Sequence, residues 1–116
     1  MENEIKVGNW IRDREGHITK IIQTLSLFKD VELYLGEDGY QYSDNAIVKH
    51  SPNLIDLIQC GDYVNGYIVR RTYLDGAIHY IKLGEQITGN RTYNDDIKTV
   101  VTKEMMESIS YKVTKM

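Results

Sequence analysis

Hydrophobic and polar positions alternate along most of the chain, and turns containing glycine interrupt them, which predicts a protein built mainly of β-hairpins. The strongest turn signal is Asn65-Gly66, because both residues accept the positive φ that a two-residue type I′ turn requires. Asp75-Gly76 repeats this pattern one strand later. Residues 61–83 are therefore predicted to form a three-stranded antiparallel meander.

The N-terminal half has similar turns. Arg14-Glu15-Gly16 separates a strand predicted over residues 7–13 from the next strand over residues 17–25. Asp38-Gly39 links the strand-like residues 31–35 to a further short strand. Both halves of the chain are therefore expected to be rich in β-structure.

Two short segments have the pattern of helices. Ser51 and Pro52 precede an apolar run over residues 54–58, which predicts one or two helical turns capped by Ser51. Thr102 precedes residues 103–109, whose apolar positions have helical spacing, and predicts a second capped helix.

The similarity of these segments extends to an internal repeat. Residues 43–59 align without gaps to residues 94–110: polar residues, a β-branched strand, a Ser or Thr, then an apolar helix. Residues 7–11 match residues 60–64 in the order apolar, Gly, Asn or Asp, aromatic, β-branched. The repeat indicates two units of the same design.

We therefore predict a mainly β (α+β) fold of two tandem small barrel-like (SH3-like) β units, each with a short capped helix. Residues 1–59 form the first predicted unit and residues 60–116 the second, packed into one compact body. The alternative is a single sheet of about five to eight strands with two helical turns.

Composition narrows the function. A chain of 116 residues with 41% hydrophobic residues can bury a core of its own, and Cys60 has no second cysteine with which to form an internal disulfide. A net charge of -3, with both signs intermixed, argues against binding of nucleic acid driven by charge alone. The N-terminus lacks the pattern of a signal peptide and no apolar run reaches membrane length, so we expect a cytoplasmic protein without a membrane partner.

The sequence contains no recognisable catalytic motif. His17, His50 and His79 are isolated and lack the spacing of metal ligands, and Cys60 precedes a hairpin, where packing is its expected role. We therefore expect no catalytic residue, no metal and no cofactor, and a protein that is not an enzyme.

The nine tyrosines suggest a binding surface. With a turn at Asp75-Gly76, the expected register pairs Tyr73 with Ile78, Arg71 with Tyr80 and Val69 with Lys82. The opposite face is the expected core and contains Ile68, Arg70, Thr72, Leu74, Ala77, His79, Ile81 and Leu83. The predicted partner-binding residues of the outer face are Tyr67, Arg71, Tyr73, Tyr80 and Lys82.

We call these five residues the stripe, and their chemistry fits two classes of partner. Tyr and Arg on a rigid sheet dominate protein interfaces and also stack on nucleobases. Only Arg71 and Lys82, with help from Arg91, could neutralise phosphates, so a protein partner ranks first and nucleic acid second.

A second candidate surface is the acidic loop of the first unit. Glu37 and Asp38 precede Tyr40 and Tyr42, which are spaced to share one strand face. The combination suits a basic partner, such as a nucleic-acid-binding protein.

Four segments carry a resemblance to known proteins: residues 5–12 (IKVGNWIR), 47–58 (IVKHSPNLIDLI), 61–67 (GDYVNGY) and 97–104 (IKTVVTKE). They resemble small proteins carried by phages and mobile elements of low-GC Gram-positive bacteria. The resemblance implies a phage-encoded inhibitor that binds a host or phage protein, and anti-CRISPR activity is one such role. The alternative is a small-barrel nucleic-acid-binding accessory protein. Pairing of an exposed edge strand with a second copy leaves a dimer open.

Overall fold

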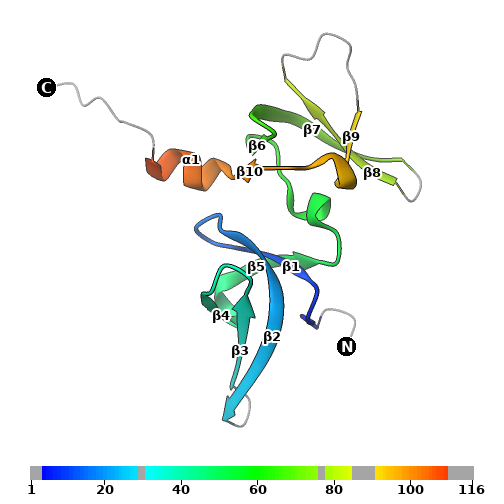
Figure 1. The fold of residues 1–116 in the computed structure, drawn as a ribbon. Helices are drawn as coiled ribbons and strands as arrows, with labels where there is room; N and C mark the ends of the chain where they lie inside the picture. Colours follow the sequence, from blue (N-terminus) through cyan, green and yellow to red (C-terminus); the bar gives the residue numbers. More distant parts are fainter. Residues whose placement is uncertain (1–3, 29–30, 76–77, 85–90, 110–116) are drawn as a thin grey trace, which may run out of the picture.

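The computed structural model describes residues 4–28, 31–75, 78–84 and 91–109 of the chain. Figure 1 shows two β-sheets, one from each half of the chain, with the first sheet below the second in this view. The fold is therefore mainly β, as predicted.

The first sheet is antiparallel and has the strand order β4-β3-β2-β1-β5. Its strands are β1 (Trp10–Asp13), β2 (Ile18–Phe28), β3 (Val31–Gly36), β4 (Gln41–Ser43) and β5 (Ile47–Ser51). Two 3-10 helices belong to this half of the chain, η1 (Asp44–Ala46) and η2 (Leu54–Leu57).

The second sheet is also antiparallel and has the order β10-β6-β7-β8-β9. Its strands are β6 (Tyr63–Val64), β7 (Tyr67–Asp75), β8 (Ile78–Leu83), β9 (Arg91–Tyr93) and β10 (Val100–Val101). The 3-10 helix η3 (Asn94–Asp96) precedes β10, and helix α1 (Lys103–Ile109) follows it.

The two sheets have the same strand order when strands are matched by their position in the chain. The long second strand of each half also changes partner in the same way: its first residues pair with the first strand and its later residues with the third. The ladder becomes irregular after this change, between Ile21 and Gln23 in β2 and between Val69 and Arg71 in β7. Such bulges bend a strand and let one strand serve two partners.

The turn before the first strand of each half has a shared local structure. Gly8 and Gly61 have φ values of +96° and +97°, which a residue with a Cβ rarely adopts. The next side chain, Asn9 or Asp62, accepts the backbone N–H of the residue three positions earlier, at 3.0 and 2.7 Å. The match between residues 7–11 and 60–64 thus corresponds to equivalent backbone positions.

The other part of the sequence alignment is one residue out of step. It paired Ser43 with Asn94, but Ser43 ends β4 whereas Asn94 begins η3, after β9 has ended at Tyr93. The gapless alignment depended on matching the Ser and the Thr that precede the two helices. These helices differ in type and length, so the two residues are not at equivalent positions.

The predicted turns and caps were largely correct. Asn65 and Gly66 both have positive φ, 54° and 87°, and join the paired strands β6 and β7. Thr102 caps α1, because its hydroxyl accepts the N–H of Met105 at 3.3 Å. The helix expected after Ser51 is instead a 3-10 helix that starts at Leu54, and Ser51 is the last residue of β5.

Two apolar cores support the sheets. The first contains Ile5, Ile11, Ile21, Tyr34 and Tyr42. The second contains Ile55, Ile58, Val64, Val69, Ile81 and Leu83. Ile55 and Ile58 come from the first half of the chain, so the segment around η2 completes the core beneath the second sheet.

The register of the β7–β8 hairpin differs from the prediction. Tyr73 pairs with Tyr80, Arg71 with Lys82 and Val69 with Leu83, and residues 76–77 of the predicted turn region lie outside the described residues. The predicted core face was also wrong in part: Ile81 and Leu83 are buried, but Arg70, Thr72 and Leu74 are exposed. The bulge after Val69 turns this residue inward, and Leu74 lies near the far end of the hairpin.

Candidate functional site

Two cross-strand rows define the outer face of the second sheet. The register places Arg71, Lys82 and Arg91 side by side on β7, β8 and β9. It places Tyr73, Tyr80 and Tyr93 side by side in the next row. We call these six residues the Tyr–Arg face, and it lies opposite the side on which Ile81 enters the core.

The tyrosine row is packed. The rings of Tyr73 and Tyr80 stack with centroids 5.0 Å apart and an interplanar angle of 15°, and the ring of Tyr93 lies 6.1 Å from that of Tyr80. The guanidinium of Arg91 lies 4.6 Å from the centre of the Tyr80 ring, in cation–π geometry. Tyr80 is consequently buried, at 8% exposure, although it was predicted to lie outside the core. Its neighbours on the face cover it.

The structure brings together four of the five residues predicted for this stripe. Tyr67 lies at the start of β7, opposite Val64, and is 46% exposed outside the two rows. Tyr93 was not predicted. The sequence signal that could have found it is the spacing of Arg91 and Tyr93, two positions apart, which places both on one face of a strand.

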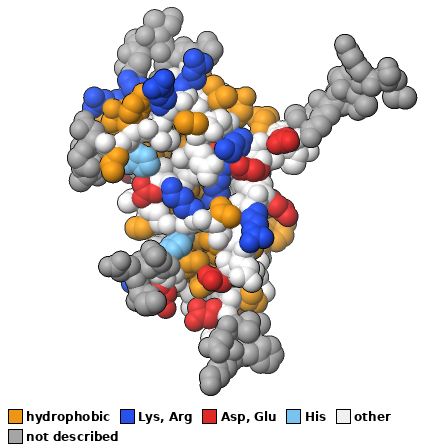
Figure 2. Space-filling view, turned by 180° about the vertical axis from the view of Figure 1, so that it is seen from behind, with side chains coloured by type: hydrophobic (Ala, Val, Ile, Leu, Met, Phe, Trp, Pro, Cys, Tyr) orange, Lys and Arg blue, Asp and Glu red, His pale blue; other side chains and the backbone are white. Residues whose placement is uncertain are grey.

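Charged side chains are unevenly distributed over the side of the molecule seen in Figure 2. Figure 2 shows Lys and Arg side chains gathered at the upper end, over the second sheet, with hydrophobic side chains between them. Acidic side chains are more frequent toward the lower end, over the first sheet. The row of Arg71, Lys82 and Arg91 on the second sheet suits a partner with negative charge.

The acidic loop of the first sheet lies apart from the Tyr–Arg face. Asp38, Tyr40 and Tyr42 line a hollow of about 480 Å³, together with Asp13 and other residues. The two tyrosines do not share an environment as predicted: Tyr40 is 69% exposed, whereas Tyr42 is in the first core. The reason is that Tyr40 precedes β4 and Tyr42 lies inside it. Glu37 is exposed beside Asp38.

The hydroxyl of Tyr42 is held by this loop. It donates a hydrogen bond to Asp38 at 2.5 Å. Burial, together with this bond and the charge of Asp38, raises the pKa of Tyr42 well above its usual value. Tyr42 is thus a neutral core residue that holds the acidic loop in place. Tyr40 and the carboxylates of the loop are the groups that could contact a partner.

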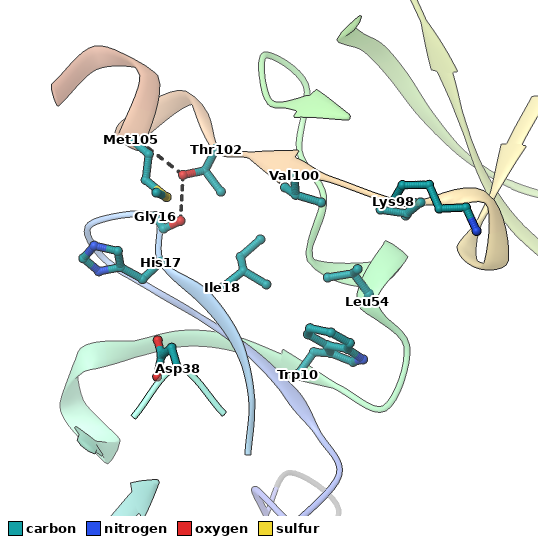
Figure 3. A pocket seen from close by; sticks show the side chains of 11 residues that line it. Trp10, Gly16, His17, Ile18, Asp38, Leu54, Lys98, Val100, Thr102 and Met105 are labelled. Carbon is teal, nitrogen blue, oxygen red and sulfur yellow. Dashed lines mark hydrogen bonds between the residues drawn. The ribbon is translucent and has the colours of Figure 1, made fainter. Parts of the chain in front are cut away.

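A cleft of about 340 Å³ lies between the two halves of the chain. Figure 3 shows Trp10, Ile18, Leu54 and Val100 pointing toward one another across it, while Lys98 extends away. Ile18 and Val100 are also packed against the second core. The cleft therefore lies at the interface between the two halves, and the residues that line it mainly contribute to the packing of this interface.

A buried ion network crosses the same boundary and was not predicted. Arg12 of β1 is 1% exposed and donates to both oxygens of Asp62, at 2.5 and 2.9 Å, and to Glu104 at 2.6 Å. Burial opposes the charge of Arg12, but the bonds to Asp62 and Glu104 outweigh it and raise the pKa of Arg12. Sequence gave no signal because the partners lie far apart along the chain.

Among the described residues, Ser51, Asp56 and His79 lie together but are not arranged as a nucleophile with its base. His79 contacts Asp56 at 2.7 Å, and Asp56 also accepts the Ser51 hydroxyl at 2.5 Å, so the carboxylate separates the serine from the histidine. A nucleophile needs direct contact with its base. Cys60, expected to be packed, is exposed, and its thiol lies 3.3 Å from the carbonyl oxygen of Arg70.

Two further observations concern other classes of site. Within the part of the chain that the structure describes, no group of three or more His, Cys, Asp or Glu side chains is arranged to hold a metal ion. Among the same residues, no helix combines the length and apolar character needed to cross a bilayer.

Comparison with protein families, with curated proteins and with solved structures finds no match for this chain.

Proposed function

We propose that the protein is a non-catalytic binding protein that uses the Tyr–Arg face to hold an acidic surface of another protein. The observation that carries this proposal is the row of three cations, Arg71, Lys82 and Arg91, on adjacent strands. Three cationic side chains aligned across adjacent strands present positive charge in a fixed geometry, which is complementary to a partner surface that carries carboxylates.

The tyrosine row supports the same function. Tyr73 and Tyr93 flank the buried ring of Tyr80, one stacked on it and the other tilted, so the surface beside the cations is aromatic and held in place by ring contacts. A preorganised aromatic surface loses little side-chain entropy on binding. Aromatic and arginine side chains together are typical of the residues that dominate protein interfaces.

The proposal includes the finer architecture. The chain is two tandem SH3-like units, residues 1–59 and 60–116, and the second unit carries the partner surface. The shared strand order and the matching bulges support two copies of one design. Ile55 and Ile58 pack beneath the second sheet, and Thr102 donates to the carbonyl of Gly16 at 2.6 Å, so each unit contributes to the stability of the other.

The biological role that we propose is inhibition of a host system by a phage-encoded protein. This step rests on the resemblance of the sequence to small phage proteins. The acidic loop at Glu37, Asp38 and Tyr40 would then compete for the basic channel of a nucleic-acid-binding effector, such as an effector of host defence, while the Tyr–Arg face holds an acidic region of the same target.

A nucleic-acid-binding function is the second candidate. The observation that favours it is again the cation row, because three adjacent cations beside tyrosines could follow a phosphate backbone. The tyrosine packing argues against it. Tyr80 is covered by its neighbours, so the row offers fewer free ring faces for stacking on bases than three separate tyrosines would.

The deciding experiment is a pull-down with the tagged full chain from a low-GC Gram-positive lysate, with and without nuclease. A stoichiometric protein that survives nuclease would support the proposal. Loss of all partners after nuclease would support the nucleic-acid function.

Matched variants assign the surface. Arg71→Gln removes one cation of the row and is expected to weaken binding of the recovered partner about tenfold, the loss for one charge-assisted hydrogen bond. Arg70→Gln removes the same charge from the neighbouring, exposed position at the bulge and should leave affinity unchanged. Equal effects of the two variants would show that only overall charge matters, which contradicts the assignment of this face.

A further inference from the structure

A separate hollow of about 460 Å³ lies near the end of the second sheet, beside η2 and η3. We call it the His79 pocket. The residues of its wall used here are Asp56, Leu74, His79, Tyr93, Asn94 and Asp95. It adjoins the Tyr–Arg face only through Tyr93, whose ring also contacts Tyr80.

We propose that the His79 pocket binds the side chain of an arginine or lysine from another protein. The aliphatic part of that side chain would lie against Leu74, and its charged head would reach the acceptor atoms of His79 and Asp95. The arguments are the contact that orients the histidine, the charge of the wall and the exposure of Leu74.

Asp56 orients the ring of His79. Burial opposes ionisation of Asp56, but hydrogen bonds with Ser51 and His79 outweigh it and lower the pKa of Asp56. The ionised Asp56 accepts the proton on Nδ1 of His79, 2.7 Å away. The ring therefore lies at a fixed place in the wall, with its other nitrogen, Nε2, free of this contact, and His79 is partly exposed. A neutral ring oriented in this way can accept a hydrogen bond from a ligand at Nε2.

The charge of the wall favours a cation. Among the described residues that line the pocket, Asp56 and Asp95 are carboxylates and none is Lys or Arg. Asp95 is exposed on η3 and can approach a ligand. The side-chain oxygen of Asn94 already accepts the N–H of Ile55 at 2.9 Å, so Asn94 shapes the wall. This pocket is thus opposite in charge to the Tyr–Arg face.

The apolar part of the wall fits the stem of a long side chain. Leu74 is 73% exposed, the highest value among the large hydrophobic residues that the structure describes as exposed. Lys and Arg place their methylene groups along apolar surface and keep the charged head at polar atoms. A ligand of this shape covers Leu74 and meets the acceptors at the same time.

The test uses the free, isotope-labelled full chain and therefore does not depend on the partner of the Tyr–Arg face. Nα-acetyl-arginine methylamide and Nα-acetyl-lysine methylamide are titrated while backbone NMR signals are followed. At least one should cause saturable shifts at Leu74, His79 and Asp95, with a dissociation constant in the millimolar range. Nα-acetyl-norleucine methylamide, which has a stem but no charge, should not saturate.

Two surface variants and a matched control complete the design. Asp95→Asn and Leu74→Ser should each weaken the titration roughly threefold, because each removes one exposed contact. Asp44→Asn removes the same charge from η1, the corresponding 3-10 helix of the first half, and should change nothing. Absence of saturable shifts at the pocket, equal shifts with the norleucine probe, or full affinity in both Asp95→Asn and Leu74→Ser would overturn the proposal.

Discussion

Replacing Asp62 by asparagine tests the role of the buried ion network. Asp62 is 0% exposed, and its two oxygens accept four hydrogen bonds: two from Arg12 and one each from the N–H groups of Gln59 and Lys103. Asparagine keeps the size of the side chain but offers only one acceptor oxygen. Arg12 would keep its charge in a buried site and retain only Glu104 as a carboxylate partner.

The expected cost is large. Removing one partner of a buried ion pair destabilises a protein by about 3–5 kcal/mol, because the remaining charge is left without compensation. A domain of this size has a free energy of unfolding of about 5–15 kcal/mol. Asp62→Asn should therefore remove about a fifth or more of the total stability. Glu104→Gln should cost about 1 kcal/mol or less, because Glu104 is 31% exposed.

The first half of the chain supplies a natural control for the turn. Asn9 occupies the position equivalent to Asp62 and makes the same bond to the backbone three residues earlier. An amide therefore satisfies this turn. A large loss in Asp62→Asn would come from Arg12 and the N–H of Lys103, and Asn9→Ala should cost only about 1 kcal/mol.

The assay is equilibrium unfolding in urea, followed by the fluorescence of Trp10, the only tryptophan, and by circular dichroism. The double variant Arg12→Leu/Asp62→Asn should be little less stable than either single variant, which gives a coupling energy of several kcal/mol. A loss below about 1 kcal/mol in Asp62→Asn, or additive single effects, would refute the assignment of this network as a buried tie between the halves.

Two further predictions concern close packing and tyrosine ionisation. Gly16→Ala should destabilise the chain by about 2 kcal/mol or more in the same urea assay, because Gly16 has a φ of +87° and an added Cβ would collide with the hydroxyl of Thr102. Gly39→Ala, with a φ of +89° and nothing within 4 Å, carries only the backbone cost, so equal losses would contradict the collision. Burial and a bond to a glutamate raise the pKa of Tyr34 to about 12, and Tyr42 is shifted further upward. These two hydroxyls are neutral in both states below pH 10, so their contribution to stability is constant there and is lost as the pH rises from 10 through about 12. Ultraviolet titration should show fewer tyrosinates at pH 11 in the folded chain than in urea, and equal numbers would disprove the shift.

Local structure was largely determined by the sequence. The turn at Asn65-Gly66 and the cap at Thr102 were predicted correctly because each depends on a few adjacent residues with special backbone preferences. The mainly β class and the placement of four stripe residues on one face followed from alternation and parity. Alternate residues of a strand lie on the same face, and a turn shifted by one residue changes the partner of each residue but not its face. The predicted face was therefore correct although the predicted register was wrong.

Only the tertiary structure decided the rest. The bulge after Val69 set which side chains enter the core, and β9 brought Arg91 and Tyr93 beside the predicted stripe. Arg12 and Asp62 are 50 residues apart and meet only because the two halves pack together. Contacts of this kind depend on how distant segments of the chain pack together, which a single sequence does not show directly. Turns and caps depend on the backbone preferences of adjacent residues, and these can be read from the sequence itself.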